Sequence, residues 1–168
     1  STSPLKMEFI KGINIYECMI TRTEQKRMME VLVSAINQLH ESDSVPTDYF
    51  SMHEAYFRKT VRRLSKIRDL LPFGNDQYIR VNGRACRNVY YYYEELEKRL
   101  QQLHCESFQF IHGDCTFSNL MLRDSGEPVL IDPRGYFGFT KLYGDPQYDW
   151  AKLYYSIVGN YDRFNLKE

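Results

Sequence analysis

The stretch from Phe110 to Gly135 constrains the fold of this chain most strongly, because short apolar segments alternate there with polar turns. It reads FIHGDCTFSNLMLRDSGEPVLIDPRG. Apolar residues around 108–111, 120–122 and 129–131 predict three short strands, since apolar runs of this length bounded by turn residues are typical of β-strands. Asp124-Ser125-Gly126-Glu127 supplies the residues of a tight turn between the last two. The stretch therefore predicts a small β-unit that contains a hairpin.

Polar side chains follow the ends of these strands. Asp114 and Asn119 lie on one loop, and Asp132 directly follows the last strand, so the three side chains can converge on one spot. Carboxylate and amide oxygens suit Mg²⁺, which is usually shared with substrate phosphates. A carboxylate that binds no metal can orient a hydroxyl group and accept its proton during phosphoryl transfer. The pattern favours a phosphoryl-transfer site over the alternative that these residues only cap a turn.

The motif His-Gly-Asp, followed by four residues and Asn and then by an apolar hairpin and Asp, resembles the aminoglycoside phosphotransferase and choline kinase-like family. The resemblance extends through Tyr143-Gly144-Asp145-Pro146-Gln147-Tyr148-Asp149-Trp150-Ala151. It implies the C-terminal lobe of a protein kinase-like fold that transfers the γ-phosphoryl group of ATP to a hydroxyl of a small molecule such as a sugar, an amino alcohol or an aminoglycoside.

The resemblance also implies roles for single residues. Asp114 is expected to act as the catalytic base, Asn119 and Asp132 to bind Mg²⁺, and the buried acid Asp149 to brace the catalytic loop together with His112. Two further residues near the motif have open assignments. Ser118 is a candidate contact for metal or phosphate. Arg134 either holds an acceptor or phosphate anion or forms a salt bridge with Asp145 or Asp149.

The beginning of the chain resembles the hinge between the two lobes of such a kinase. Residues 5–12 are expected to form a strand whose backbone around Glu8 and Ile10 meets the adenine of ATP; an ordinary edge strand is the alternative. The sequence contains no recognisable nucleotide-covering loop or phosphate-binding lysine. We therefore expect residues 1–168 to be a single domain, the C-terminal lobe of a longer protein with an N-terminal lobe, and to be inactive alone.

Composition limits the partners that the chain can have. Lysine and arginine number 22, as do aspartate and glutamate, so no global field favours nucleic acid or an anionic membrane. No apolar run approaches the roughly 20 residues of a membrane span. The four cysteines (Cys18, Cys86, Cys105 and Cys115) have no metal-binding spacing, which favours free thiols in the cytoplasm.

Helical periodicity predicts most of the remaining chain. Apolar residues at helical spacing predict helices over about 24–40, 48–71, 93–103 and 149–158, and a hairpin turns at Asn82-Gly83. The fold class expected is α+β and mostly helical. The second helix carries a basic stripe that either faces a phosphorylated acceptor or is a solvated surface: Arg58, Lys59, Arg62, Arg63 and Lys66.

Two other functions remain open on the sequence. A catalytically inactive scaffold or binding module with a kinase fold would fit the missing phosphate lysine. A protein kinase fits less well, because His112-Gly113-Asp114 lacks the arginine that would bind an activation-loop phosphate, and no such loop is evident after Asp132.

Overall fold

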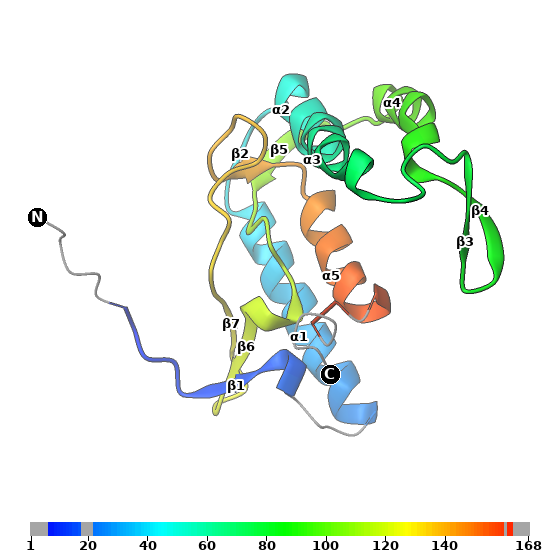
Figure 1. Cartoon of the computed structure of the whole chain (residues 1–168). Helices are drawn as coiled ribbons and strands as arrows, with labels where there is room; N and C mark the ends of the chain where they lie inside the picture. Colours follow the sequence, from blue (N-terminus) through cyan, green and yellow to red (C-terminus); the bar gives the residue numbers. More distant parts are fainter. Residues whose placement is uncertain (1–6, 18–21, 160, 163–168) are drawn as a thin grey trace, which may run out of the picture.

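The computed structural model describes residues 7–17, 22–159 and 161–162 (Figure 1). Helices and short antiparallel strands are mixed along the chain, which confirms the expected α+β class. The strands form three small sheets in the described residues, whereas the sequence indicated one β-unit and a separate hairpin. The first two sheets lie beside the central helices, and the third sheet projects from one side of the molecule (Figure 1).

The longest helix, α1 (Arg22–Glu41), and the last, α5 (Gln147–Gly159), pack together in the centre of the molecule. Leu32 and Ile36 of α1 are fully buried against Leu153 of α5 and Leu120. The spacing of four between the α1 residues places them on one face of the helix, as the periodicity predicted. Cys115, in the loop that carries the motif residues, belongs to this core, and Phe117 of the same loop packs against it.

Two three-stranded sheets flank that loop. The first has the order β1-β6-β7, from β1 (Gly12–Asn14), β6 (Leu120–Arg123) and β7 (Pro128–Leu130). The second has the order β2-β5-β8, from β2 (Ser44–Pro46), β5 (Ser107–Phe110) and β8 (Tyr143–Gly144). The chain passes from the second sheet to the first between β5 and β6, so the motif loop bridges them. The β6–β7 hairpin turns at Gly126, with φ +87°, as its sequence predicted.

The third sheet is the hairpin of β3 (Tyr78–Val81) and β4 (Arg84–Arg87). Asn82 and Gly83 join its strands with φ values of 50° and 79°, the left-handed pair that a two-residue hairpin turn requires. The helix that follows, α4 (Tyr93–Gln101), was also expected. Short helical turns also occur at η1 (Ile15–Glu17), η4 (Val89–Tyr91) and η5 (Phe117–Asn119).

The helix predicted over 48–71 is interrupted. It begins at α2 (Tyr49–His53), capped by the Asp48 side chain, and passes through a π-helical turn, η2 (Glu54–Arg58). It then continues as α3 (Lys59–Ile67) and ends in the 3₁₀ turn η3 (Arg68–Leu70). In the π turn the backbone N–H of Lys59 donates to the carbonyl of Glu54, five residues earlier. The extra residue rotates the following helix relative to α2, so a single helical periodicity did not describe both halves.

The strand predicted over residues 5–12 is wrong in its bounds. Residues 5–6 lie outside the described residues, 7–11 have no regular structure, and β1 begins at Gly12. Residues 7–11 extend away from the body of the molecule (Figure 1), and Phe9 is 89% exposed. Apolar character alone suggested a strand, but pairing with β6 starts only where Gly12 lies opposite Arg123. In the described part of the chain no helix is long and apolar enough to span a bilayer.

Candidate active site

The loop from His112 to Asn119 is held in an irregular conformation by its own backbone. The N–H of Thr116 donates to the carbonyl of Asp114 at 2.7 Å, and that of Asn119 donates to the carbonyl of Thr116 at 2.9 Å. Gly113 has φ +79°, and a Cβ atom there would lie 3.0 Å from Cβ of Arg134. Glycine is therefore required both by the left-handed backbone and by the close approach of the segment after β7.

Asp149 anchors this loop from the first turn of α5. Its Oδ1 accepts the backbone N–H of Gly113 at 2.7 Å, and its Oδ2 accepts that of His112 at 2.9 Å. Nε2 of His40, on α1, lies 3.0 Å from the same Oδ2. The Asp149 side chain is fully buried, so these bonds replace the water that the carboxylate gives up. The positive end of the α5 dipole further stabilises a negative charge at this position.

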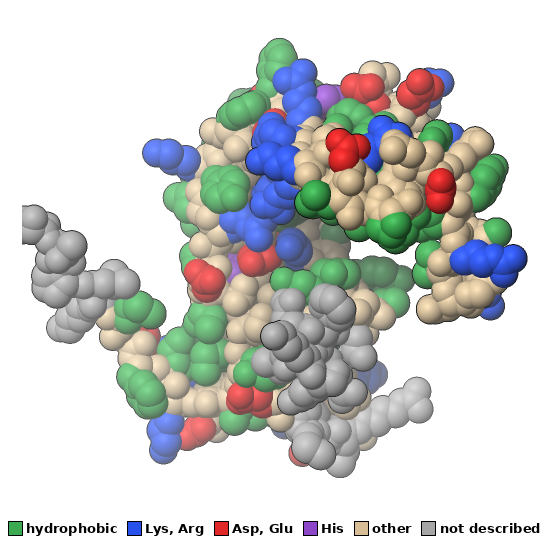
Figure 2. Space-filling view, viewed as in Figure 1, with side chains coloured by type: hydrophobic (Ala, Val, Ile, Leu, Met, Phe, Trp, Pro, Cys, Tyr) green, Lys and Arg blue, Asp and Glu red, His purple; other side chains and the backbone are tan. Residues whose placement is uncertain are grey.

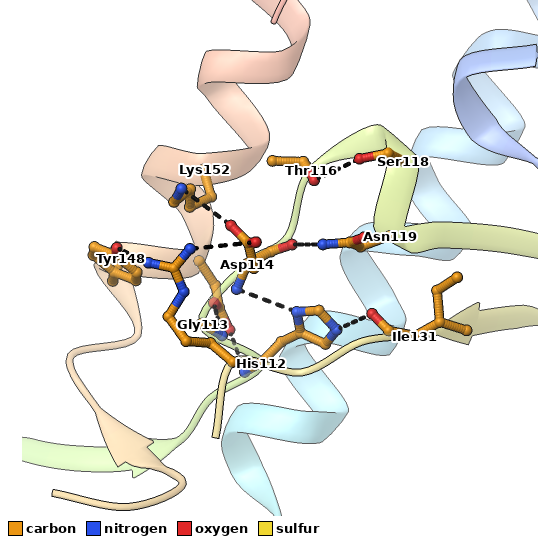
Figure 3. Close-up of polar contacts among 11 residues, drawn as sticks. His112, Gly113, Asp114, Thr116, Ser118, Asn119, Ile131, Tyr148 and Lys152 are labelled. Carbon is orange, nitrogen blue, oxygen red and sulfur yellow. Dashed lines mark hydrogen bonds and ion pairs between the residues drawn. The ribbon is translucent and has the colours of Figure 1, made fainter. Parts of the chain in front are cut away.

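His112 joins the loop to the end of β7. Its Nδ1 accepts the backbone N–H of Asp114 at 3.2 Å, which assigns the ring proton to Nε2. Nε2 then donates to the carbonyl of Ile131 at 2.8 Å (Figure 3). The ring is 3% exposed, so the geometry is that of a side chain that braces the loop.

The Asp114 carboxylate contacts two cations (Figure 3). Nζ of Lys152 lies 3.0 Å from Oδ1, and a guanidinium nitrogen of Arg134 lies 3.4 Å from Oδ2. The Asp114 side chain is 25% exposed, so solvent or a ligand can reach it. Burial alone would lower the pKa of Arg134, but Tyr148 and Asp114 outweigh burial and raise it above its usual value.

The contacts of Arg134 correct one sequence-based alternative. Its ion-pair partner is Asp114, whereas the sequence suggested Asp145 or Asp149. Those two acids are engaged elsewhere, because Asp145 accepts the Tyr56 hydroxyl at 2.8 Å and Asp149 holds the loop amides. The Arg134 N–H donates to the carbonyl of His112 at 2.8 Å, which places its side chain beside the loop.

Sequence reasoning missed Lys152 and His40. Lys152 follows Asp149 by three residues on α5, so helical spacing alone places both on the side of the helix that faces the loop. That spacing was a usable signal. His40 comes from α1 and meets Asp149 through tertiary packing, which no local pattern around His40 indicates.

Asn119 and Asp132, the expected metal ligands, lie at a junction of two segments. The N–H of Ile131 donates to the carbonyl of Asn119 at 3.0 Å, so the residue after Ile131 lies next to the loop. Nδ2 of Asn119 donates to the carbonyl of Asp114 at 3.0 Å, which fixes the amide. Within the described residues, neither Oδ1 of Asn119 nor the Asp132 carboxylate accepts a hydrogen bond.

The backbone of Asp132 has φ +54°, a left-handed conformation that non-glycine residues adopt rarely. Pro133 follows and disfavours most helical conformations at Asp132, so this arrangement costs about 1–3 kcal/mol. Two unengaged hard oxygen donors, one of them on a strained residue, fit a Mg²⁺ ion that retains several waters. No group of three His, Cys, Asp or Glu side chains in the described residues forms a metal site, and the expected pair of ligands contains only one acid and one amide.

Ser118 faces the loop interior. Its hydroxyl and that of Thr116 lie 3.0 Å apart, and its backbone N–H donates to Asp162 at 3.0 Å. Its carbonyl accepts the amide of Asn14, on β1, at 2.6 Å. These bonds hold the loop from both sides.

The structure does not bring Glu8 or Ile10 to the motif residues. The Glu8 carboxylate pairs with Arg123 at 2.8 Å, at the end of β6 farthest from Asn119. Because a strand rises about 3.3 Å per residue, the two ends of β6 are roughly 10 Å apart. Contact of this segment with adenine therefore remains a prediction.

Cys115 lies within the motif but is not a nucleophile. It is fully buried, and burial together with the charge of Asp149 raises the pKa of its thiol. The thiolate, which is the reactive form, is therefore strongly disfavoured. Cys86, Cys105 and Cys115 are free thiols; Cys18 lies outside the described residues.

Comparison with family models assigns the chain. The model of the phosphotransferase enzyme family matches residues 5–165. The chain belongs to the phosphotransferase enzyme family. This match confirms the resemblance to aminoglycoside phosphotransferases and choline kinase-like enzymes. Among the curated proteins and the solved structures, none matches the chain. The family assignment and the geometry of the motif loop are therefore the basis for a functional proposal.

Proposed function

We propose that this chain is the C-terminal lobe of a Mg²⁺-dependent kinase that transfers the γ-phosphoryl group of ATP to a hydroxyl of a small molecule. Asp114 orients the hydroxyl and accepts its proton. Asn119 and Asp132 hold the metal, and Asp149 and His112 keep the loop in place. An N-terminal lobe supplies the phosphate-binding lysine.

The observation that carries the proposal is that the backbone of the motif loop is held by buried hydrogen bonds, whereas the Asp114 carboxylate on the same loop can still meet a ligand. Buried bonds from Asp149 and His112 hold the backbone, while the Asp114 carboxylate stays partly exposed. A loop held in this way positions its catalytic group without a large entropy cost when substrate binds. A module that only binds a partner needs no such partly exposed acid on a fixed loop.

The residues present fit the chemistry of phosphoryl transfer. Mg²⁺ bound by Asn119 and Asp132 would neutralise charge on the nucleotide phosphates. The cations Arg134 and Lys152 flank Asp114, so in the proposed mechanism they would lie next to the transferring phosphoryl group. Positive charge at that point stabilises the transition state more than the ground state, because negative charge is spread over the transferring group.

The test is Asp114→Asn in the full-length protein. Asn keeps the size and the hydrogen-bonding capacity of the side chain but cannot accept the proton. ADP release should fall by about 10²-fold or more, while the affinity for Mg²⁺–ATP stays within about twofold. Asp124→Asn is the matched control, since Asp124 is exposed on the β6–β7 turn and its carboxylate pairs with the surface residue Lys11. Turnover in Asp114→Asn equal to that of the control would exclude Asp114 as the catalytic base. No ATP-dependent turnover in the unchanged full-length protein would favour the scaffold alternative.

A further inference from the structure

A basic pocket lies outside the motif loop. It has a volume of about 300 Å³ and lies between the π turn, α3 and the loop after β7. Figure 2 shows Lys and Arg side chains gathered into one patch in the region where Figure 1 labels α2 and α3. The polar and aromatic residues that line the pocket are Glu54, Lys59, Arg62, Arg63, Lys66 and Tyr136.

The carboxylates of the pocket lining do not neutralise its positive charge. Glu54 pairs with Arg62 at 2.5 Å, which uses the one acid of the lining. Within the described residues, no carboxylate lies at ion-pair distance from Lys59, Arg63 or Lys66. Like charges held together in this way repel one another, and a bound anion relieves that repulsion.

The repulsion between positive charges is clearest at Lys59. Its ammonium group lies 5.4 Å from the centre of the Tyr136 ring and is not fully exposed. Burial lowers the pKa of Lys59, and the positive charges of Arg134, Arg63 and Lys152 lower it further. The π turn ends at Arg58, immediately before Lys59, and the Lys59 N–H makes the five-residue hydrogen bond of that turn. The helical irregularity thus sets the face on which Lys59 enters the pocket.

The pocket lies within electrostatic reach of the proposed site of the acceptor hydroxyl. The two cations that influence Lys59, Arg134 and Lys152, are the two that contact the Asp114 carboxylate at 3.4 and 3.0 Å. A molecule whose hydroxyl lies at Asp114 can therefore extend toward α3 and present a second group to the basic pocket. Arginine in particular can bind phosphate or carboxylate through two parallel hydrogen bonds.

We propose that this pocket binds an anionic group of the acceptor, so that the substrate is a hydroxylated phosphate ester or hydroxy acid. A cationic acceptor, such as an amino sugar or a quaternary ammonium alcohol, would be repelled by the same residues. The inference rests on the proposed function, because it names the class of acceptor that Asp114 phosphorylates. The alternative, in which the α3 stripe is only a solvated surface, leaves the unpaired Lys59 beside Tyr136 without a ligand.

The first test measures anion binding without catalysis. Inorganic phosphate and acetate are titrated into the chain at constant ionic strength, and binding is followed by NMR shifts of the backbone amides of residues 54–66 and 134–138. The double variant Lys59→Gln/Arg63→Gln should weaken binding by about tenfold or more for each charge removed. Glutamine is a good helix former, so α3 is retained. Arg84→Gln, on the exposed strand β4, is the matched control and should bind as the unchanged chain does.

The second test measures acceptor choice in the full-length protein. A panel of hydroxylated compounds in matched neutral, amino, carboxylated and phosphorylated forms is assayed for ATP-dependent phosphorylation. An anionic form should have the highest kcat/KM, and the preferred form distinguishes a phosphate from a carboxylate source. The Lys59→Gln/Arg63→Gln variant should raise the KM for that acceptor by about tenfold or more, with a smaller change in the KM for ATP.

Three results would overturn the inference: preference for a neutral or cationic acceptor, equal anion binding by the pocket variant and the Arg84→Gln control, or a rise in the KM for ATP instead of the acceptor KM. The last would assign the pocket to nucleotide phosphates. Failure of the proposed function gives a different result, because Asp114→Asn would then leave ADP release unchanged whatever the pocket binds.

Discussion

Replacement of the buried carboxylate of Asp149 tests how the motif loop is held. Asp149→Asn preserves the volume of the side chain and exchanges one oxygen for an NH₂ group. Both oxygens of Asp149 accept backbone N–H groups, from Gly113 at 2.7 Å and from His112 at 2.9 Å. Either orientation of the amide therefore sets an NH₂ group against an N–H donor. His40 can change its tautomer so that Nε2 accepts a hydrogen bond from the new NH₂ group, but a backbone N–H cannot accept one.

The cost follows from these contacts. One buried backbone N–H is left unsatisfied, at about 1–3 kcal/mol, and the remaining bonds lose their charged acceptor, which makes them weaker by about half. Together these losses reduce the free energy of unfolding by about 3–5 kcal/mol, the range found when a buried ionic contact loses one partner. For a chain of this size, the melting temperature should fall by about 6–20 °C.

Urea unfolding followed by tryptophan fluorescence measures the loss, since Trp150 neighbours Asp149 and contacts the His40 ring edge-to-face at 5.6 Å. Glu95→Gln is the control. The Glu95–Arg99 pair is exposed on α4, and its loss should cost about 0.5 kcal/mol or less. His40→Gln should fall between the two, because both loop amides keep the carboxylate. A loss below about 1 kcal/mol for Asp149→Asn would refute the view that this carboxylate holds the loop.

Three further substitutions test single features of the fold and site. Asp132→Asn should leave stability within about 0.5 kcal/mol, because Asn also tolerates a left-handed backbone, yet weaken Mg²⁺-dependent nucleotide binding; an unchanged Mg²⁺ titration would remove its metal role. Gly138→Ala should cost at least about 2 kcal/mol more than Gly83→Ala in urea unfolding, because both have positive φ but only the Cβ at 138 would meet a backbone carbonyl, at 2.3 Å. The hydroxyl of Tyr143 holds the pKa of Asp43 below its usual 3.8. This pair therefore adds stability above about pH 4, and that stability is lost as the pH falls through the lowered pKa. Tyr143→Phe should raise the pKa of Asp43 in an NMR titration, and an unchanged pKa would refute the link.

Local patterns predicted the elements whose formation depends on neighbouring residues. The face of α1 that contains Leu32 and Ile36 was visible as helical spacing, and the β3–β4 turn was visible as Asn82-Gly83. The π turn before Lys59 was not visible, because the extra residue changes the phase of the helix without changing its composition. The apolar segment at 7–11 misled the prediction, since a strand needs a partner as well as propensity.

The residues of the candidate site likewise fall into those that local sequence patterns identified and those that they did not. Asp114, Asn119 and Asp132 could be singled out because they follow strand ends within one short stretch of the chain. The partners of Asp114 could not, because Arg134 and Lys152 reach it from the segment after β7 and from α5. Sequence spacing thus identifies the groups of a motif, whereas the charges around them depend on how separate elements pack.

This difference has a consequence for how substitutions act on the protein. The side chains that hold the loop, Asp149 and His112, are buried, and both oxygens of Asp149 and both ring nitrogens of His112 are hydrogen-bonded. Their loss should therefore act mainly on stability. Asp114 and Asp132 are exposed enough to meet a ligand, and removal of their charge leaves no buried donor unsatisfied. Stability and turnover should therefore respond to different residues of the same loop. A motif in which one set of residues did both tasks would show the two losses together at each position.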